Sequence, residues 1–247
     1  MRYVDHLREL PFVRSPIMRL RALGRHPERR TNTLTTVMYH GMPAHTRRTF
    51  IRQLDYMRSL GDFVTAAQAV EMLGSGARID GKYFCVTFDD GQKDAFENAI
   101  PILAERRIPS TFFIVPSWAS AADQAFMSWA DCRQLPGNGV TIGSHSLSHH
   151  RFSTLDEKQA RSEMVVSKNR LESEIGLPCE HFACPWGQPV ADYVPSRDPR
   201  LAEDAGYRSF FTTIRGAACA GVSAWAIPRV RLEPDWGTHQ LRYLFSR

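Results

Sequence analysis

The sequence predicts an α/β fold built on a parallel sheet that is either open or closed into a barrel. Short apolar segments with strand character alternate with segments of helical periodicity, and this alternation is typical of parallel sheets. The chain has 247 residues, 43% of them hydrophobic, which suits one large domain with a sizeable core. In both architectures, functional sites form at the carboxyl ends of the strands.

The positive charge of the chain is concentrated near its beginning. The formal net charge is +5, and residues 1–30 hold eight arginines against three acidic residues, so the remainder is neutral. A nucleic-acid-binding surface on the main domain therefore has no support from charge. We expect residues 1–30 to form a short, helical, basic and amphipathic arm, and residues 31–247 to form the main domain. The arm either rests on an anionic membrane surface or packs on the domain or a partner.

The cysteines indicate the redox compartment. There are five, an odd number, and no Cys-x-x-Cys pair occurs, which indicates a reducing environment rather than a disulfide framework. The sequence shows no secretory signal and no stretch of membrane-spanning length. We therefore expect a cytoplasmic protein, or one peripheral to the inner face of the membrane through its arm.

The first half of the main domain alternates strands and helices. Apolar runs rich in β-branched and aromatic residues predict strands at residues 35–39, 83–88 and 111–115. Apolar residues at helical spacing predict helices at about residues 50–60, 65–73 and 94–107.

The second half continues the alternation with shorter strands. Residues 140–143 predict a strand, and Thr154 with Glu157 forms a capping-box pair that predicts the start of a long helix. Gly176 marks the end of this helix. Later strands are expected at residues 181–184, 208–213 and 224–227.

Two adjacent carboxylates, Asp89 and Asp90, follow the strand predicted at residues 83–88. A buried strand that stops on paired acids places them at the edge of the core, facing a cleft. One carboxylate can then bind a cation while the other stays free as a base. An ordinary Asp-Asp-Gly turn is the alternative interpretation of this motif alone.

Two histidines follow the strand predicted at residues 140–143. His145 and His149 are four residues apart, so a helical turn that starts at Ser144 would present both imidazoles on one face. Two imidazoles and one carboxylate are a frequent ligand set for a catalytic divalent metal. A serine-rich turn is the alternative, but strand-end histidines and strand-end acids on one rim favour the metal site.

Three motifs, in this order, resemble the first three motifs of the polysaccharide deacetylase family (NodB homology domain, carbohydrate esterase family 4). They are residues 87–91 (TFDDG), 145–149 (HSLSH) and 182–187 (FACPWG). The framing residues 38–40 (MYH) and 127–129 (MSW) match too, and the resemblance runs from Thr35 to Leu232. It implies a distorted (β/α) barrel and metal-dependent hydrolysis of an acetyl group on a sugar.

The resemblance also assigns roles to site residues. It makes Asp90, His145 and His149 the metal ligands and Asp89 the general base. Such ligands suit Zn²⁺, and Co²⁺, Ni²⁺ or Fe²⁺ also fit them. The cation would lower the pKa of its water and, with a backbone N–H near Trp186, stabilise the oxyanion.

The third motif is expected to contact the substrate. Pro185 and Gly187 let the backbone pass close to the sugar, and Trp186 offers an apolar face for the ring. A core aromatic is the alternative for Trp186. We place His40, which follows the first strand, in the same substrate-binding set.

The sequence departs from the family pattern in two places. Ala183 stands where many members carry an arginine that orients the base, and residues 227–232 (IPRVRL) lack a late histidine that acts as general acid. We predict that Arg229 supplies the missing guanidinium near Asp89 as a bidentate clamp. The candidates for the general acid are His40, His150 and His239.

The sequence therefore predicts a metal-dependent deacetylase of an N-acetylated sugar, such as a glycan or a lipid-linked or nucleotide-linked intermediate. Two alternatives stay open: a small-amide, allantoinase-like C–N hydrolase, and a sugar-binding protein that has lost catalysis. Ala183 and the missing late histidine motivate the second alternative. No nucleic-acid partner is expected.

Overall fold

The computed structural model describes residue 22, residues 32–121 and residues 123–246. Their strands form one eight-stranded sheet in which all pairings of named strands are parallel, in the order β7-β6-β5-β4-β3-β1-β8, with β2 beside β3. The strands are β1 (Thr33–Tyr39), β2 (Asp62–Phe63), β3 (Lys82–Phe88), β4 (Ser110–Ile114), β5 (Val140–Ser144), β6 (His181–Ala183), β7 (Ser209–Phe211) and β8 (Arg229–Arg231).

The sheet curls into a nearly closed barrel. Its two end strands approach each other because Ile227, just before β8, forms a parallel bridge with Phe211 of β7. The amide of Arg229 then donates to the carbonyl of Ile214 at 2.9 Å, which continues the connection. A distorted (β/α) barrel, as expected from the family resemblance, is confirmed.

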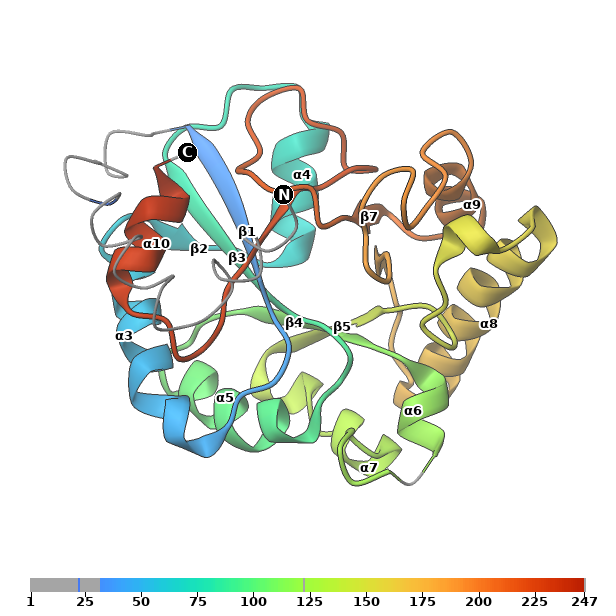
Figure 1. Ribbon diagram of the computed structural model, residues 1–247, viewed down its shortest axis with the longest axis horizontal. Helices are drawn as coiled ribbons and strands as arrows, with labels where there is room; N and C mark the ends of the chain where they lie inside the picture. The colour runs from blue at the N-terminus through green and yellow to red at the C-terminus, as the bar shows by residue number, and fades with distance from the viewer. Residues whose placement is uncertain (1–21, 23–31, 122, 247) are drawn as a thin grey trace, which may run out of the picture.

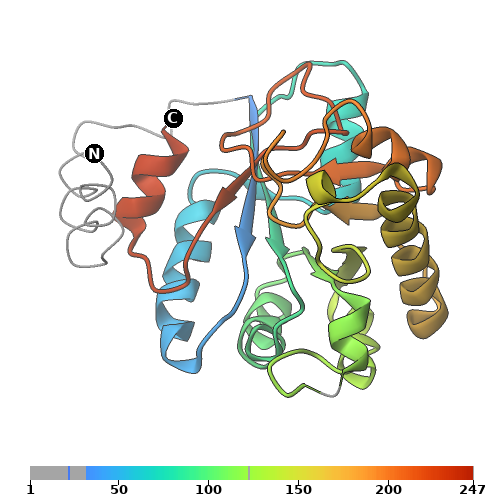
Figure 2. The same cartoon turned by 45° about the vertical axis from the view of Figure 1, so that its right-hand side comes forward.

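Helices cover the outside of the barrel, as Figures 1 and 2 show. Helix α10 lies beside α3, and α9 lies against α8. The α-helices are α3 (Arg47–Arg58), α4 (Ala66–Gly74), α5 (Lys93–Glu105), α6 (Pro116–Ser120), α7 (Trp129–Cys132), α8 (Glu157–Ile175), α9 (Asp198–Asp204) and α10 (Thr238–Phe245). Short 3-10 turns are η2 (Ala44–Thr46), η3 (Pro136–Asn138) and η4 (Phe152–Thr154).

Alternation along the strands separates two apolar layers. On β3, Phe84, Val86 and Phe88 belong to the large cluster beneath the helices, in which Phe88 stacks on Phe112 with ring centroids 4.5 Å apart. Cys85 belongs to a second, smaller cluster. The other members of that cluster on β4, β6 and β7 are Phe113, Ala183 and Phe211. This smaller cluster lies beside the buried Arg229, whose guanidinium carbon is 5.6 Å from the Phe113 ring.

Two sequence-based predictions of elements are wrong. The long helix α8 begins after Asp156, whose side chain accepts from the amide of Gln159 at 2.8 Å. The predicted cap Thr154 instead donates its hydroxyl hydrogen to the backbone carbonyl of Arg151. Residues 224–227 form no strand apart from the Ile227 bridge, and β8 lies two residues later. The remaining predicted strands and helices occur within a few residues of their expected positions, and Gly176 ends α8 with φ 76°.

The basic arm predicted for residues 1–30 lies outside the described residues, except for Ala22, which is buried in the large apolar cluster. Among the described helices, none combines the length and apolar character that crossing a membrane requires. The five cysteines are all free thiols, and only Cys219 is exposed.

Candidate active site

The predicted site residues meet at the carboxyl ends of β1, β3 and β5. Asp89 and Asp90 directly follow β3, His145 directly follows β5, and His40 directly follows β1. The sheet pairing continues one residue further, since the Asp89 amide donates to the Tyr39 carbonyl at 2.9 Å. Parallel strands thus bring motifs separated by more than fifty residues to one edge of the barrel.

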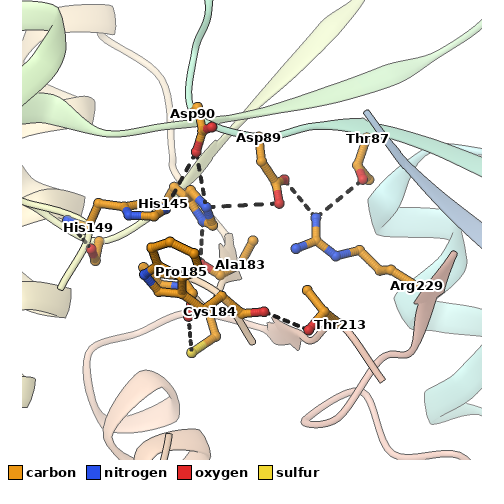
Figure 3. Close-up of polar contacts among 12 residues, drawn as sticks. Thr87, Asp89, Asp90, His145, His149, Ala183, Cys184, Pro185, Thr213 and Arg229 are labelled. Atoms are coloured by element: carbon orange, nitrogen blue, oxygen red, sulfur yellow. Dashed lines mark hydrogen bonds and ion pairs between the residues drawn. The ribbon is translucent and has the colours of Figure 1, made fainter. Parts of the chain in front are cut away.

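Asp90, His145 and His149 converge on one point, with their candidate ligand atoms all within 4.8 Å of one another (Figure 3). Asp90 Oδ1 lies 3.6 Å from His145 Nε2 and 3.5 Å from His149 Nε2. These separations are too long for hydrogen bonds. Ligands of one tetrahedral zinc ion, each about 2.0–2.1 Å from the metal, lie about 3.3 Å apart.

The unpaired oxygen of Asp90 supports this interpretation. Asp90 Oδ1 is buried and has no hydrogen-bond partner, although buried carboxylate oxygens ordinarily have one. Its neighbours are two imidazole nitrogens rather than donors in hydrogen-bonding geometry. A divalent cation would satisfy all three groups, so the residues present fit a metal ion.

Both imidazoles are in a suitable state to act as neutral ligands, because their pKa values are lowered. His145 Nδ1 lies 2.8 Å from the Ala183 carbonyl, which can only accept, so Nδ1 carries the proton and Nε2 presents its lone pair to Asp90. Burial lowers the pKa of His145, against the raising effect of Asp89 and Asp90. Burial, followed by the neighbouring His145, lowers the pKa of His149 to about 4.

The loop between the two histidines is not the helical turn predicted from their spacing. Ser146 and His149 have φ angles of 63° and 62°, which lie in the left-handed region, and the segment has no helical hydrogen bonds. The imidazoles still share a face, with ring centroids 4.9 Å apart. An irregular loop, rather than a helix, brings them together.

Asp89 is held by Arg229, as Figure 3 shows. Arg229 Nη1 lies 2.7 Å from Asp89 Oδ1, and the two side chains are 0% and 2% exposed. Burial, the largest single influence, raises the pKa of Asp89, but the Arg229 guanidinium together with His145 and, to a smaller extent, His40 holds this pKa below its ordinary value. Asp89 is therefore ionised at neutral pH.

The clamp is not bidentate, so that part of the prediction is wrong. Only Nη1 of Arg229 contacts Asp89, while Nε donates to the Thr212 carbonyl at 2.9 Å and Nη2 is buried without a partner. Arg229 reaches Asp89 from β8, across β1. The second donor that an end-on fork would need, Nη2, makes no bond to Asp89.

The third motif forms one wall of the site. Trp186 is 53% exposed, with φ 63°, and its ring centroid lies 5.6 Å from that of His149. The Arg151 guanidinium covers the Trp186 ring at 4.3 Å. Gly187 has φ 74°, and a Cβ there would lie 2.8 Å from the Thr213 amide nitrogen, so the turn requires glycine. Trp186 is thus a surface aromatic and not a core residue.

The three candidate proton donors lie in different surroundings. His40 directly follows β1, which pairs with β3, the strand that ends before Asp89. His150 is exposed, and His239 lines a separate groove. Of the three, His40 is the one that directly follows a strand at the edge where Asp89 and His145 lie.

A groove of about 960 Å³ opens beside this centre at the same edge of the barrel. Gln92 connects the two, because its side-chain amide donates to Asp90 Oδ2 at 3.4 Å and it also lines the groove. The walls are largely polar and include the acidic residues Asp94, Glu233 and Asp235 as well as Arg52. The groove contains none of the candidate metal ligands.

Sequence reasoning missed two contributors. Glu163 of α8 bonds to the loop between the two histidines, and the Trp118 ring lies 4.9 Å from the His149 ring. The sequence carried no signal for Glu163, because charged residues also stand beside other buried positions of α8, as Glu172 does beside Leu171. For Trp118 the sequence carried no signal.

Comparison with known proteins places the chain in a family. The sequence profile described as polysaccharide deacetylase matches residues 77–210. YxkH of Bacillus subtilis (strain 168) is 25% identical over 207 residues, which are 81% of this chain and 72% of that protein. The chitooligosaccharide deacetylase of Sinorhizobium fredii is 26% identical over 143 residues, 56% of this chain and 55% of that protein.

Solved structures agree on the fold. IcaB from Ammonifex degensii superposes with a TM-score of 0.72 and 26% identity, over 87% of this chain and 98% of that one. The Streptococcus pyogenes deacetylase PplD has a TM-score of 0.76 and 20% identity, over 87% and 99% of the two chains, and this likeness shows the fold alone. The chain belongs to the polysaccharide deacetylase family. This membership supports deacetylation of N-acetylated sugars as its activity.

Proposed function

We propose that this protein is a metal-dependent hydrolase that removes the acetyl group from an N-acetylated sugar, with Asp89 as the general base. The observation that carries the proposal is the convergence of Asp90, His145 and His149 around an unpartnered carboxylate oxygen. The ionised Asp89 beside them is the second element. A divalent cation bound there would supply Lewis-acid activation of water and of the acetyl carbonyl.

Asp89 has one oxygen available for proton transfer. Oδ1 is bonded to Arg229, whereas Oδ2 faces the site, 3.9 Å from His145 Nε2. We assign to Oδ2 the proton of the water that attacks the acetyl carbon. The C–N bond then breaks, the sugar nitrogen takes up a proton, and acetate leaves. The position of His40 directly after β1, beside the strand that ends before Asp89, supports His40 as the donor of that proton.

The surroundings of the centre favour a sugar over a small amide. Trp186, which is 53% exposed, offers an apolar surface to a pyranose ring beside the Arg151 guanidinium, and the groove of about 960 Å³ leaves space for further glycan units. The contact of Arg229 with Asp89 also weakens the case for a binding protein without catalysis. Arg229 supplies to Asp89 the guanidinium that an arginine at position 183 supplies in many family members.

The direct test combines metal content with acetate release. Purified wild type, Asp90→Ala and His145→Ala are compared by elemental analysis, and acetate is measured after incubation with N-acetylated chitooligosaccharides and with cyclic and linear amides. We expect about one divalent ion per wild-type chain, lost in both variants, and acetate release from the sugars alone. A wild type without metal after supplementation, or turnover restricted to the amides, would contradict the proposal.

The cellular location and the role of residues 1–30 stay predictions. The net charge of +5 in this segment supports contact with an anionic inner membrane face and, with it, a lipid-linked substrate. Sedimentation with vesicles of anionic and of neutral lipid, for the full chain and for a chain lacking residues 1–30, tests this. Equal sedimentation of the two chains would remove the support.

A further inference from the structure

The loop of residues 145–149, here called the histidine loop, is bonded to one side chain of α8. Glu163 Oε2 accepts from the Leu147 amide at 3.0 Å and from the Ser148 amide at 2.9 Å. Glu163 Oε1 accepts from the Ser148 hydroxyl at 2.6 Å. One carboxylate therefore binds three donors of a five-residue loop, and bonds to an ionised acceptor are stronger than those between neutral groups.

The loop needs such support because its backbone is not helical. Ser146 and His149 adopt the left-handed region, which residues other than glycine hold only when their surroundings enforce it. In a helical turn the amides of Leu147 and Ser148 would point along the helix axis. Here both point at Glu163. From the other side, the Ser117 amide of α6 donates to the Leu147 carbonyl at 3.1 Å.

We propose that Glu163 is a positioning residue of the metal centre, whose carboxylate holds the histidine loop so that His145 and His149 face Asp90. The inference rests on the proposed function, because it takes these three residues to be metal ligands. Glu163 acts through the backbone of Leu147 and Ser148, and Ser148 directly precedes His149. A loop released from Glu163 would spend a smaller fraction of its time in the ligand-binding conformation. The apparent affinity for the metal falls in proportion to that fraction.

Helix α8 offers a matched control. Glu172 lies on the same helix and also accepts from a backbone amide, that of Cys179 at 2.9 Å, while pairing with Lys168. Its partners precede β6 and lie outside the histidine loop. Removal of Glu172 therefore costs one amide bond and one ion pair on the same helix without releasing the histidines.

The test measures metal affinity and not turnover. Zn²⁺ and Co²⁺ are titrated against a chromogenic chelator in wild type, Glu163→Ala, Glu163→Gln and Glu172→Ala. For Glu163→Ala we expect about 10- to 100-fold weaker binding, the usual cost of losing a residue that orients metal ligands. Glu163→Gln, which keeps the shape but loses the charge, should be intermediate, and Glu172→Ala should match wild type. The visible spectrum of bound Co²⁺ should change in Glu163→Ala and stay unchanged in Glu172→Ala.

The outcomes separate this inference from the proposed function. Wild-type affinity in Glu163→Ala overturns it, and so does an equal loss in Glu172→Ala, which would indicate a general effect on stability. If circular dichroism shows that Glu163→Ala is unfolded, Glu163→Gln decides, and wild-type affinity in that variant overturns the inference. A folded wild type that binds neither metal would contradict the proposed function itself, and the inference with it.

Discussion

Arg229 and Asp89 form a buried ion pair between residues 140 positions apart in the sequence, with Nη1 2.7 Å from Oδ1. Asp89 follows β3 and Arg229 begins β8, and the two strands flank β1 in the barrel. The guanidinium also donates to the Thr212 carbonyl and lies over the Phe113 ring. The pair thus links the barrel interior to the candidate active site.

The two members of this pair should be coupled in stability. Removal of Arg229 in Arg229→Met leaves an uncompensated buried carboxylate, which should lower the free energy of unfolding by about 3–5 kcal/mol. The double variant with Asp89→Asn should lose about 2 kcal/mol less than the sum of the single variants. Urea unfolding of all four proteins measures the coupling. Strictly additive losses would show that the pair is not energetically linked.

Lysine should not replace Arg229 in catalysis. In Arg229→Lys the ammonium can still reach Asp89, but one nitrogen cannot also keep the bonds that Nε makes to Thr212 and Nη1 makes to Thr87. We expect kcat for acetate release to fall at least about tenfold. This is a small part of the rate enhancement of about 10²–10⁴-fold that a general base contributes. Steady-state kinetics checks this. Undiminished turnover would mean that Arg229 does not orient the base.

The adjacent acids should fail in different ways. Asp89→Asn should keep its metal, because Asp90 and both histidines remain, but kcat should fall by about 10²–10⁴ with the loss of the base. Asp90→Asn should instead bind the metal more weakly, and its activity should fall because the metal is lost. Elemental analysis after dialysis, beside initial rates, separates the two effects. Identical behaviour of the two variants would contradict the division of roles.

His40 can be tested as a proton donor against substrate binding. If it donates the proton, His40→Gln should lower kcat by about 10²-fold or more with KM nearly unchanged. A substrate contact would instead raise KM. His150→Gln is the control, since His150 is the exposed neighbour of His149. Equal kinetics for His40→Gln, His150→Gln and wild type would exclude both roles for His40.

His181 should make stability depend on pH. Burial lowers the pKa of His181 to about 4 in the folded chain, against about 6.5 unfolded. Between these values the unfolded chain binds the proton and the folded chain does not, so stability is full above pH 6.5 and is lost as pH falls toward 4. From pH 7.5 to 5.0 this loss amounts to about 2 kcal/mol.

The measurement compares urea unfolding of wild type and His181→Gln at pH 7.5 and pH 5.0, with a chelator present so that both lack metal. Glutamine preserves a polar partner for Ser209, which lies 2.9 Å from His181 Nδ1. The variant should lose about 2 kcal/mol less than wild type over this range. The same loss in both proteins would place the pH dependence elsewhere.

The strand-end motifs were readable from the sequence for a physical reason. A run of buried apolar residues that stops on polar ones predicts both a strand and its rim, as at Asp89 after β3 and His145 after β5. Parallel strands bring their carboxyl ends to one rim, so the sequence places Asp90 and His145 on the same rim. The strand order, in which only β4 separates β3 from β5, decides how close they lie. Local rules of this kind fail where several caps compete, as Thr154 and Asp156 do before α8.

The sequence by itself determined the alternation of strands and helices, the residue types of the candidate metal site and the rim on which they lie. The tertiary structure decided the rest, because those contacts join residues far apart in the chain. The hydrogen bond from Arg229 to Asp89 depends on the position of β8 beside β1. The non-helical histidine loop follows from Glu163, which offers the amides of Leu147 and Ser148 a better partner than a helical turn does.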